Sequence, residues 1–153
     1  MHEVVFKSPH AFDEHRIHAA SVYCSDGRWG ENFDDFNYDH LKLLRYDRFA
    51  VPGGPATLAR KANASFDVAC AHMELLIVAH GLTRVCLIQH DDCAYYLQKL
   101  GVDPAELKKV QEEDLARAAE NVLAIDKALS VEAYLAVRTG EKRDAVQFEA
   151  VSL

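Results

Sequence analysis

The segment RVCLIQHDDC (residues 84–93) joins a β-rich apolar run to a polar loop. Its first half is a short apolar run with β-branched residues, which is typical of a strand buried on both faces of a parallel sheet. A second run of this kind, residues 17–23 (IHAASVY), leads into the polar stretch Cys24-Ser25-Asp26-Gly27-Arg28. Both runs therefore predict buried strands that end in loops with reactive side chains.

The segments around these two runs alternate between extended and helical patterns. We expect strands at residues 17–23, 47–51, 84–88, 130–137 and 145–151, and helices within 29–47, over 57–80 and over 103–129. Thr57 is placed to cap the start of the second helix, and Gly81 follows its end. This alternation predicts an α/β fold: a mostly parallel central sheet with helices on both faces and an antiparallel edge strand.

The chain of 153 residues has the length of one ordinary domain. No repeat or linker divides it, so we expect a single domain over 1–153, with residues 1–15 as an amino-terminal arm. The net charge of −7 argues against nucleic acid and anionic membranes as partners, because both bind positive surfaces. The sequence shows no signal-peptide pattern and no membrane-length apolar run, which favours a cytoplasmic protein with thiols rather than disulfides.

Cys24, His90 and Cys93 offer two sulfur ligands and one nitrogen ligand, a set that suits zinc. In parallel sheets, ligands bind at the carboxyl ends of strands near a topological switch point, so the two motifs can meet in space. Three protein ligands leave a fourth tetrahedral position open, as in catalytic sites, where zinc lowers the pKa of a bound water to about 7. We predict one Zn²⁺ per chain; the alternative is a buried thiol beside a polar loop.

Asp26 and Arg28 follow Cys24 at alternate positions. In an extended loop alternate residues point the same way, so all three side chains can face one site. Arg28 is expected to hold the Asp26 carboxylate in a bidentate pair, which keeps it ionised and able to accept a hydrogen bond from zinc-bound water. The alternative is an ordinary surface ion pair.

Several other candidates are interpreted without a site role. Cys70 and Cys86 lie on apolar faces, and we expect both to be core residues. Trp29, Phe33 and Phe36 either pack on the chain's own core or serve a subunit interface.

At these motifs the chain resembles the β-class carbonic anhydrases, as a compact, divergent member. That family has Cys-x-Asp-x-Arg after its first strand and His-x-x-Cys after a later one; both are present here, in that order. The resemblance implies that Cys24, His90 and Cys93 bind zinc. It also implies that Asp26 orients the zinc hydroxide, or ligates zinc in a resting form, while Arg28 holds Asp26. The implied protein is a zinc lyase that reversibly hydrates carbon dioxide to bicarbonate through zinc-bound hydroxide, and that forms a homodimer or a dimer of dimers.

The sequence also departs from the family's pattern. Gln89 and Ala94 stand where glycine is usual, Val51–Pro55 replaces an Arg-Asn segment, and Tyr95 and Tyr96 replace smaller residues. These changes spare the ligands and affect the substrate pocket. Two alternatives to carbonic anhydrase activity therefore stay open: a zinc hydrolase acting on carbon disulfide or carbonyl sulfide, and a zinc-binding module without catalysis.

Overall fold

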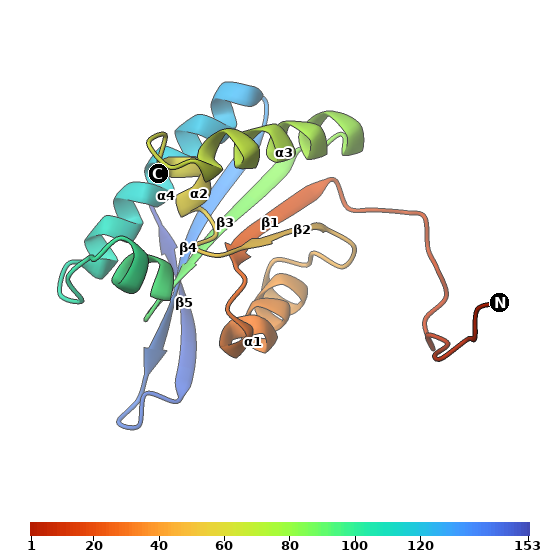
Figure 1. Ribbon diagram of the computed structural model, residues 1–153, viewed down its shortest axis with the longest axis horizontal. Coiled ribbons are helices and arrows are strands. Elements are labelled where there is room, and N and C mark those ends of the chain that lie inside the picture. The colour runs from red at the N-terminus through yellow and green to blue at the C-terminus, as the bar shows by residue number, and fades with distance from the viewer.

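A computed structural model describes all residues, 1–153, as five strands and four α-helices (Figure 1). The strands are β1 (Ala19–Cys24), β2 (Asp47–Val51), β3 (Arg84–His90), β4 (Ser130–Thr139) and β5 (Ala145–Val151). The α-helices are α1 (Gly30–Asp35), α2 (Ala56–Ala59), α3 (Ser65–His80) and α4 (Leu107–Ile125). Shorter helical turns are a 3₁₀ turn (Gly27–Trp29) and two π-helical turns (Phe36–His40 and Tyr95–Lys99). The predicted order of strands and helices is confirmed.

The sheet has the strand order β2-β1-β3-β4-β5. The first four strands run parallel, and β5 pairs antiparallel with β4. In the centre, Val22 of β1 lies opposite Phe49 of β2 on one side and Leu87 of β3 on the other. Because the chain runs from β1 to one neighbour and returns on the other side, the β1–β3 boundary is the topological switch point at which α/β proteins bind ligands.

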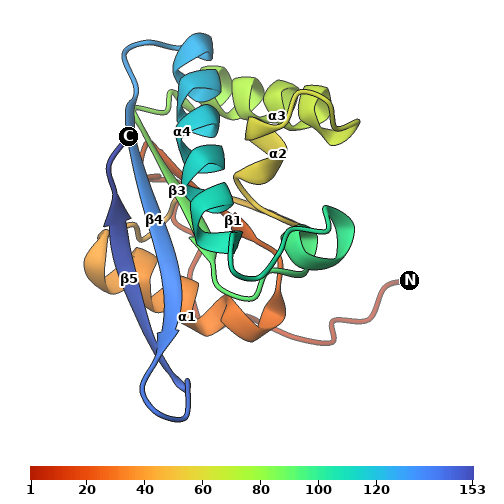
Figure 2. The ribbon, with the colours of Figure 1, turned by 90° about the vertical axis from the view of Figure 1, so that its left-hand side faces the viewer.

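Helices cover both faces of the sheet, with α1 on one face and α2, α3 and α4 on the other (Figures 1 and 2). Sheet residues toward the three-helix side include Ala20, Val22, Val85, Leu87 and Ala133. Those toward α1 include Ala19, Tyr23, Cys86, Ile88 and Ala136. Trp29, Phe33 and Phe36 are buried in this second core, so these aromatic residues pack within their own chain. The fold class predicted from the alternating pattern is confirmed.

The prediction of one continuous helix over residues 57–80 is wrong. It is divided into α2 and α3, and the break begins at Arg60, whose backbone leaves the helical region (φ −105°, ψ 87°). Arg60 instead sends its Nε to a carboxylate oxygen of Asp114 on α4, 2.7 Å away. Thr57 caps no helix, because its hydroxyl donates to the carbonyl of Gly54. Gly81 does end α3 in the left-handed conformation (φ 62°), as predicted.

The expected third helix is also shorter than predicted at both of its ends. Asp103 accepts the backbone N–H of Ala105 in a turn, and α4 begins only at Leu107 and ends at Ile125. Residues 1–16 contain no helix or strand, are exposed, and extend away from the sheet (Figure 1). None of the helices combines the length and the apolar character required to cross a bilayer.

Candidate metal centre

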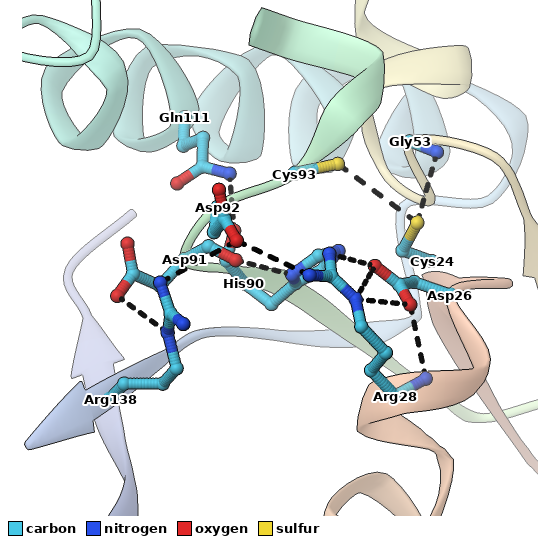
Figure 3. A network of polar contacts seen from close by, with 10 residues as sticks. All are labelled: Cys24, Asp26, Arg28, Gly53, His90, Asp91, Asp92, Cys93, Gln111 and Arg138. Carbon is cyan, nitrogen blue, oxygen red and sulfur yellow. Dashed lines mark hydrogen bonds and ion pairs between the residues drawn. The ribbon is translucent and has the colours of Figure 1, made fainter. Parts of the chain in front are cut away.

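Cys24, His90 and Cys93 meet at the carboxyl edge of the sheet. Cys24 is the last residue of β1, His90 is the last residue of β3, and Cys93 follows in the loop after β3. All three are buried, and their ligand atoms lie within 4.8 Å of one another. The two Sγ atoms are 4.0 Å apart (Figure 3). Parallel pairing of β1 with β3 therefore brings the two sequence motifs together as expected.

This group fits a tetrahedral zinc ion. Two sulfurs bound at about 2.3 Å lie roughly 3.8 Å apart in a tetrahedral site, close to the observed separation. Nδ1 of His90 lies 2.6 Å from the carbonyl oxygen of Asp91, and it must donate because a carbonyl only accepts. Nε2 then carries the free lone pair, and this buried atom has no hydrogen-bond partner. An orphaned buried nitrogen is costly, and a metal would satisfy it.

Negative charge in this group is concentrated on Cys24. The pKa of its thiol is lowered, first by the hydrogen bond from Cys93 and further by His90 and the backbone N–H of Gly53, against the effect of burial. The pKa of Cys93 is raised, because its thiol donates to Cys24 and because it is buried. The thiolate is the form that binds metal, so the lowered pKa of Cys24 favours the binding form of this ligand.

Asp26 and Arg28 form the predicted bidentate pair. Nη2 of Arg28 lies 2.7 Å from Oδ2 of Asp26, and Nε lies 3.1 Å from Oδ1. The loop is not extended, because Asp26 caps the 3₁₀ turn Gly27–Trp29 by accepting the backbone N–H of Arg28. Hydrogen bonds from Arg28 outweigh partial burial and lower the pKa of the Asp26 carboxyl. Asp26 is therefore a fixed, ionised acceptor two residues from a candidate ligand.

The loop after His90 is tied to the β4–β5 hairpin by ion pairs. Arg143 binds Asp91, and Arg138 reaches Asp91 and Asp92 at 3.6 and 3.5 Å. Asp92 also accepts from Arg28 at 3.3 Å (Figure 3). The two motifs are thus joined by charged side chains as well as by the candidate ligands.

An open pocket of about 530 Å³ lies beside this centre. Its lining residues include Cys24, Asp26, Pro52, Gly53, Ala94 and Tyr95. Four of these, Pro52, Gly53, Ala94 and Tyr95, are positions at which the sequence departs from the family's pattern. The pocket therefore brings a small molecule next to both Cys24 and Asp26.

Several residues around the centre escape prediction from the sequence. Gly53 donates its N–H to Sγ of Cys24 at 3.4 Å, and Gln111 donates its amide to the carbonyl of His90 at 2.8 Å. Gln89 of β3 and Asp114 of α4 are also fully buried. For the three buried side chains among them, the sequence offers one indication: a polar residue at a buried position of a strand or helix requires a hydrogen-bond partner.

Comparison with known proteins agrees with this description. A family model described as "Putative carbonic anhydrase" matches residues 14–145. No curated protein matches the chain.

Solved structures of carbonic anhydrases share the fold. β-Carbonic anhydrase isoform I of Trichomonas vaginalis is 14% identical with a TM-score of 0.57, over 94% of this chain and 88% of that one. The Streptococcus mutans enzyme is 14% identical with a TM-score of 0.58, over 95% and 88%. The Glaciozyma antarctica enzyme is 15% identical with a TM-score of 0.53, over 88% and 82%. At this level of identity the likeness shows the fold.

Proposed function

Since this chain belongs to the β-class carbonic anhydrase family, we propose that it is a zinc-dependent enzyme that reversibly hydrates carbon dioxide to bicarbonate. The observation that carries the proposal is the buried Cys24, His90 and Cys93 group, in which Nε2 of His90 has no partner. Family membership supplies the reaction, and the donor set supplies the reason to expect a metal. The proposed cofactor is one Zn²⁺ per chain.

Each residue of the site has a defined task in this proposal. Cys24, His90 and Cys93 would hold the zinc, and the bound ion would make a water nucleophilic by lowering its pKa to about 7. Asp26 accepts a hydrogen bond from the attacking water and so orients its lone pair toward the carbon of carbon dioxide. Arg28 keeps the Asp26 carboxylate ionised and in place by occupying both of its oxygens. A proton then leaves to solvent through the open pocket as bicarbonate departs.

Metal content and stopped-flow hydration rates test the proposal. Wild type should contain one zinc per chain, and Cys24→Ser should lose both zinc and activity. Asp26→Asn should keep zinc and lose about 10²-fold or more in rate, because it removes a charged acceptor from the reacting water. Cys70→Ser, which lies outside the candidate ligand group, is the matched control and should retain both. Wild type with stoichiometric zinc and no hydration above the buffer rate would sink the proposal.

The altered pocket favours a second candidate function. Pro52, Ala94 and Tyr95 line it, at positions where the family usually has an Arg-Asn segment, a glycine and a smaller residue. This lining suits a hydrolase of carbon disulfide or carbonyl sulfide, which are less polar relatives of the first substrate. A substrate panel distinguishes the two, since turnover confined to carbon dioxide rejects the hydrolase. Zinc without turnover of any of the three compounds would indicate a non-catalytic module.

A homo-oligomer and a cytoplasmic location complete the proposal. β2 is an edge strand with one free side, and α3 exposes Val68, Leu75 and Val78. Exposed apolar clusters of this kind commonly mark contact surfaces between subunits. Light scattering coupled to size-exclusion chromatography measures the mass directly, and a monomer at micromolar concentration would contradict the expected dimer or tetramer.

A further inference from the structure

The turn Pro52–Pro55 is seated directly on the candidate ligand Cys24. Gly53, at φ 81°, donates its N–H to the sulfur at 3.4 Å (Figure 3). Gly54 packs on the backbone of β1 so closely that a Cβ at this residue would lie 2.7 Å from the carbonyl carbon of Tyr23. The position of this turn therefore decides where the N–H of Gly53 points.

A buried side chain holds this turn from the sheet. Nε2 of Gln89 donates to the carbonyl oxygen of Gly53 at 3.3 Å and to the hydroxyl oxygen of Tyr96 at 2.7 Å. The Tyr96 hydroxyl donates to Asp114 at 2.9 Å. A carboxylate only accepts, so the hydroxyl proton points at Asp114 and its oxygen is left to accept from Gln89. The result is a directional chain of hydrogen bonds from α4 to the turn.

The far end of this chain is anchored by charge. Asp114 is fully buried, and its two oxygens are held by Arg60 at 2.7 Å and Arg117 at 3.1 Å. At the other end, Oε1 of Gln89 is buried without a partner. An unpaired buried oxygen is costly, so an apolar residue would suit the strand better if packing were the only demand at this position. All hydrogen bonds of the Gln89 side chain are therefore made by its amide nitrogen, to Gly53 and Tyr96.

We propose that Gln89 and Tyr96 are positioning residues that hold the N–H of Gly53 on the sulfur of Cys24 and thereby set the affinity of the site for metal. A donor aimed at a ligand sulfur fixes its orientation and tunes its bond to the metal. Gln89, Tyr96 and the Gly53 turn are also positions that depart from the family's pattern, and their contacts make these departures one linked change. The proposal rests on the metal-binding part of the proposed function and does not depend on the reaction.

The test compares Gln89→Met, which keeps the volume and removes the amide, with Tyr96→Phe, which removes only the hydroxyl. Zinc affinity is measured by competition with a chelator, and the Co²⁺-loaded protein reports the thiolate-to-metal band in its visible spectrum. We expect Gln89→Met to weaken zinc about 10-fold or more and to shift the band. Tyr96→Phe should weaken zinc a few-fold and shift the cobalt band in the same direction. In metal-free protein, exchange of the Gly53 amide, followed by NMR, should accelerate roughly 10-fold in Gln89→Met.

Asn37→Leu is the matched control, because this fully buried amide also donates to a carbonyl, that of Phe33, on the opposite face of the sheet. It should change neither the cobalt band nor the exchange of Gly53. Wild-type zinc affinity, band and Gly53 exchange in both test variants would overturn the proposal; if Gln89→Met does not fold, Tyr96→Phe decides alone. A wild type that hydrates no carbon dioxide while the variants still shift these readouts would reject the reaction and leave the positioning role standing. If wild type binds no metal, Gly53 exchange decides the positioning role.

Discussion

Replacing Gly53 by alanine should destabilise the protein in two separable ways. The residue has φ 81°, in the left-handed region, where a side chain costs about 1–2 kcal/mol. A Cβ there would also lie 2.6 Å from Cγ of Tyr95, an overlap with a ring that packs over the turn. Overpacking of this kind costs about 1–3 kcal/mol. The expected total for Gly53→Ala is therefore about 2–5 kcal/mol, or a fall in melting temperature of roughly 6–15 °C for a chain of this length.

Gly101 separates the two contributions. It has a similar backbone conformation, φ 67°, but a Cβ at this residue would meet no atom within 4 Å. Gly101→Ala should therefore show the backbone strain alone, about 1 kcal/mol or roughly 3 °C, partly offset by the lower entropy of the unfolded chain. The difference between the two variants measures the contact with Tyr95.

Urea unfolding and calorimetry of Gly53→Ala, Tyr95→Ala and the double variant provide the assay. If the ring is what the new methyl group meets, the double variant should be more stable than the sum of the single effects predicts, by at least about 1 kcal/mol. Additive effects, or equal losses in Gly53→Ala and Gly101→Ala, would show that the ring of Tyr95 does not contribute to the cost.

Three further predictions concern titration, thiol reactivity and metal. Burial alone would raise the pKa of Glu132, but hydrogen bonds from Arg84 and Tyr134 lower it. The ion pair of Arg84 with Glu132 therefore stabilises the fold fully above the ordinary carboxyl pKa, and this stabilisation is lost as pH falls through the lowered pKa. Arg84→Met should thus cost about 1 kcal/mol in urea unfolding at pH 7 and clearly less at pH 3.5; a constant difference would contradict this. In zinc-free protein at pH 7, iodoacetamide should modify Cys24, whose pKa is lowered, but not Cys86, because burial raises the pKa of Cys86 to about 12. Bound zinc should protect Cys24 from the reagent. Peptide mass mapping that shows Cys86 labelled first would refute this assignment. Removing zinc with a chelator should lower the melting temperature by roughly 5–10 °C if the free metal exceeds its dissociation constant about 100-fold, and an unchanged melting curve would argue against a bound metal.

Strand pairing and the site were predictable from the sequence for one physical reason. Short apolar runs that end in polar loops specify buried parallel strands, and the carboxyl ends of such strands lie at one edge. Cys24 and His90 could therefore be placed together before any coordinates were known. The antiparallel strand Ala145–Val151 was also predictable, because the turn at Gly140 precedes an alternating run.

The missed features depend on contacts between distant segments. Residues 57–80 have helical periodicity throughout, yet the helix breaks at Arg60, whose side chain binds Asp114, a residue 54 positions further along the chain. In the same way, the amide of Gln89 acquires its partners only when the Gly53 turn and Tyr96 pack around it. Local pattern does not encode such partners, although a polar residue inside a buried strand indicates that some partner exists.

The placement of the three candidate ligands along the chain has a consequence for when a metal can bind during synthesis and folding. Cys24 and Cys93 lie 69 residues apart, and the segment between β1 and β3 contains α1, β2, α2 and α3. A nascent chain therefore exposes Cys24 long before its partners emerge, and closing so large a loop is slow relative to local helix formation. We therefore expect an ion to bind after the central strands have paired, because pairing of β1 with β3 is what brings the three candidate ligands together. Zinc would be acquired as a late step, so its uptake should report that the centre of the sheet is complete.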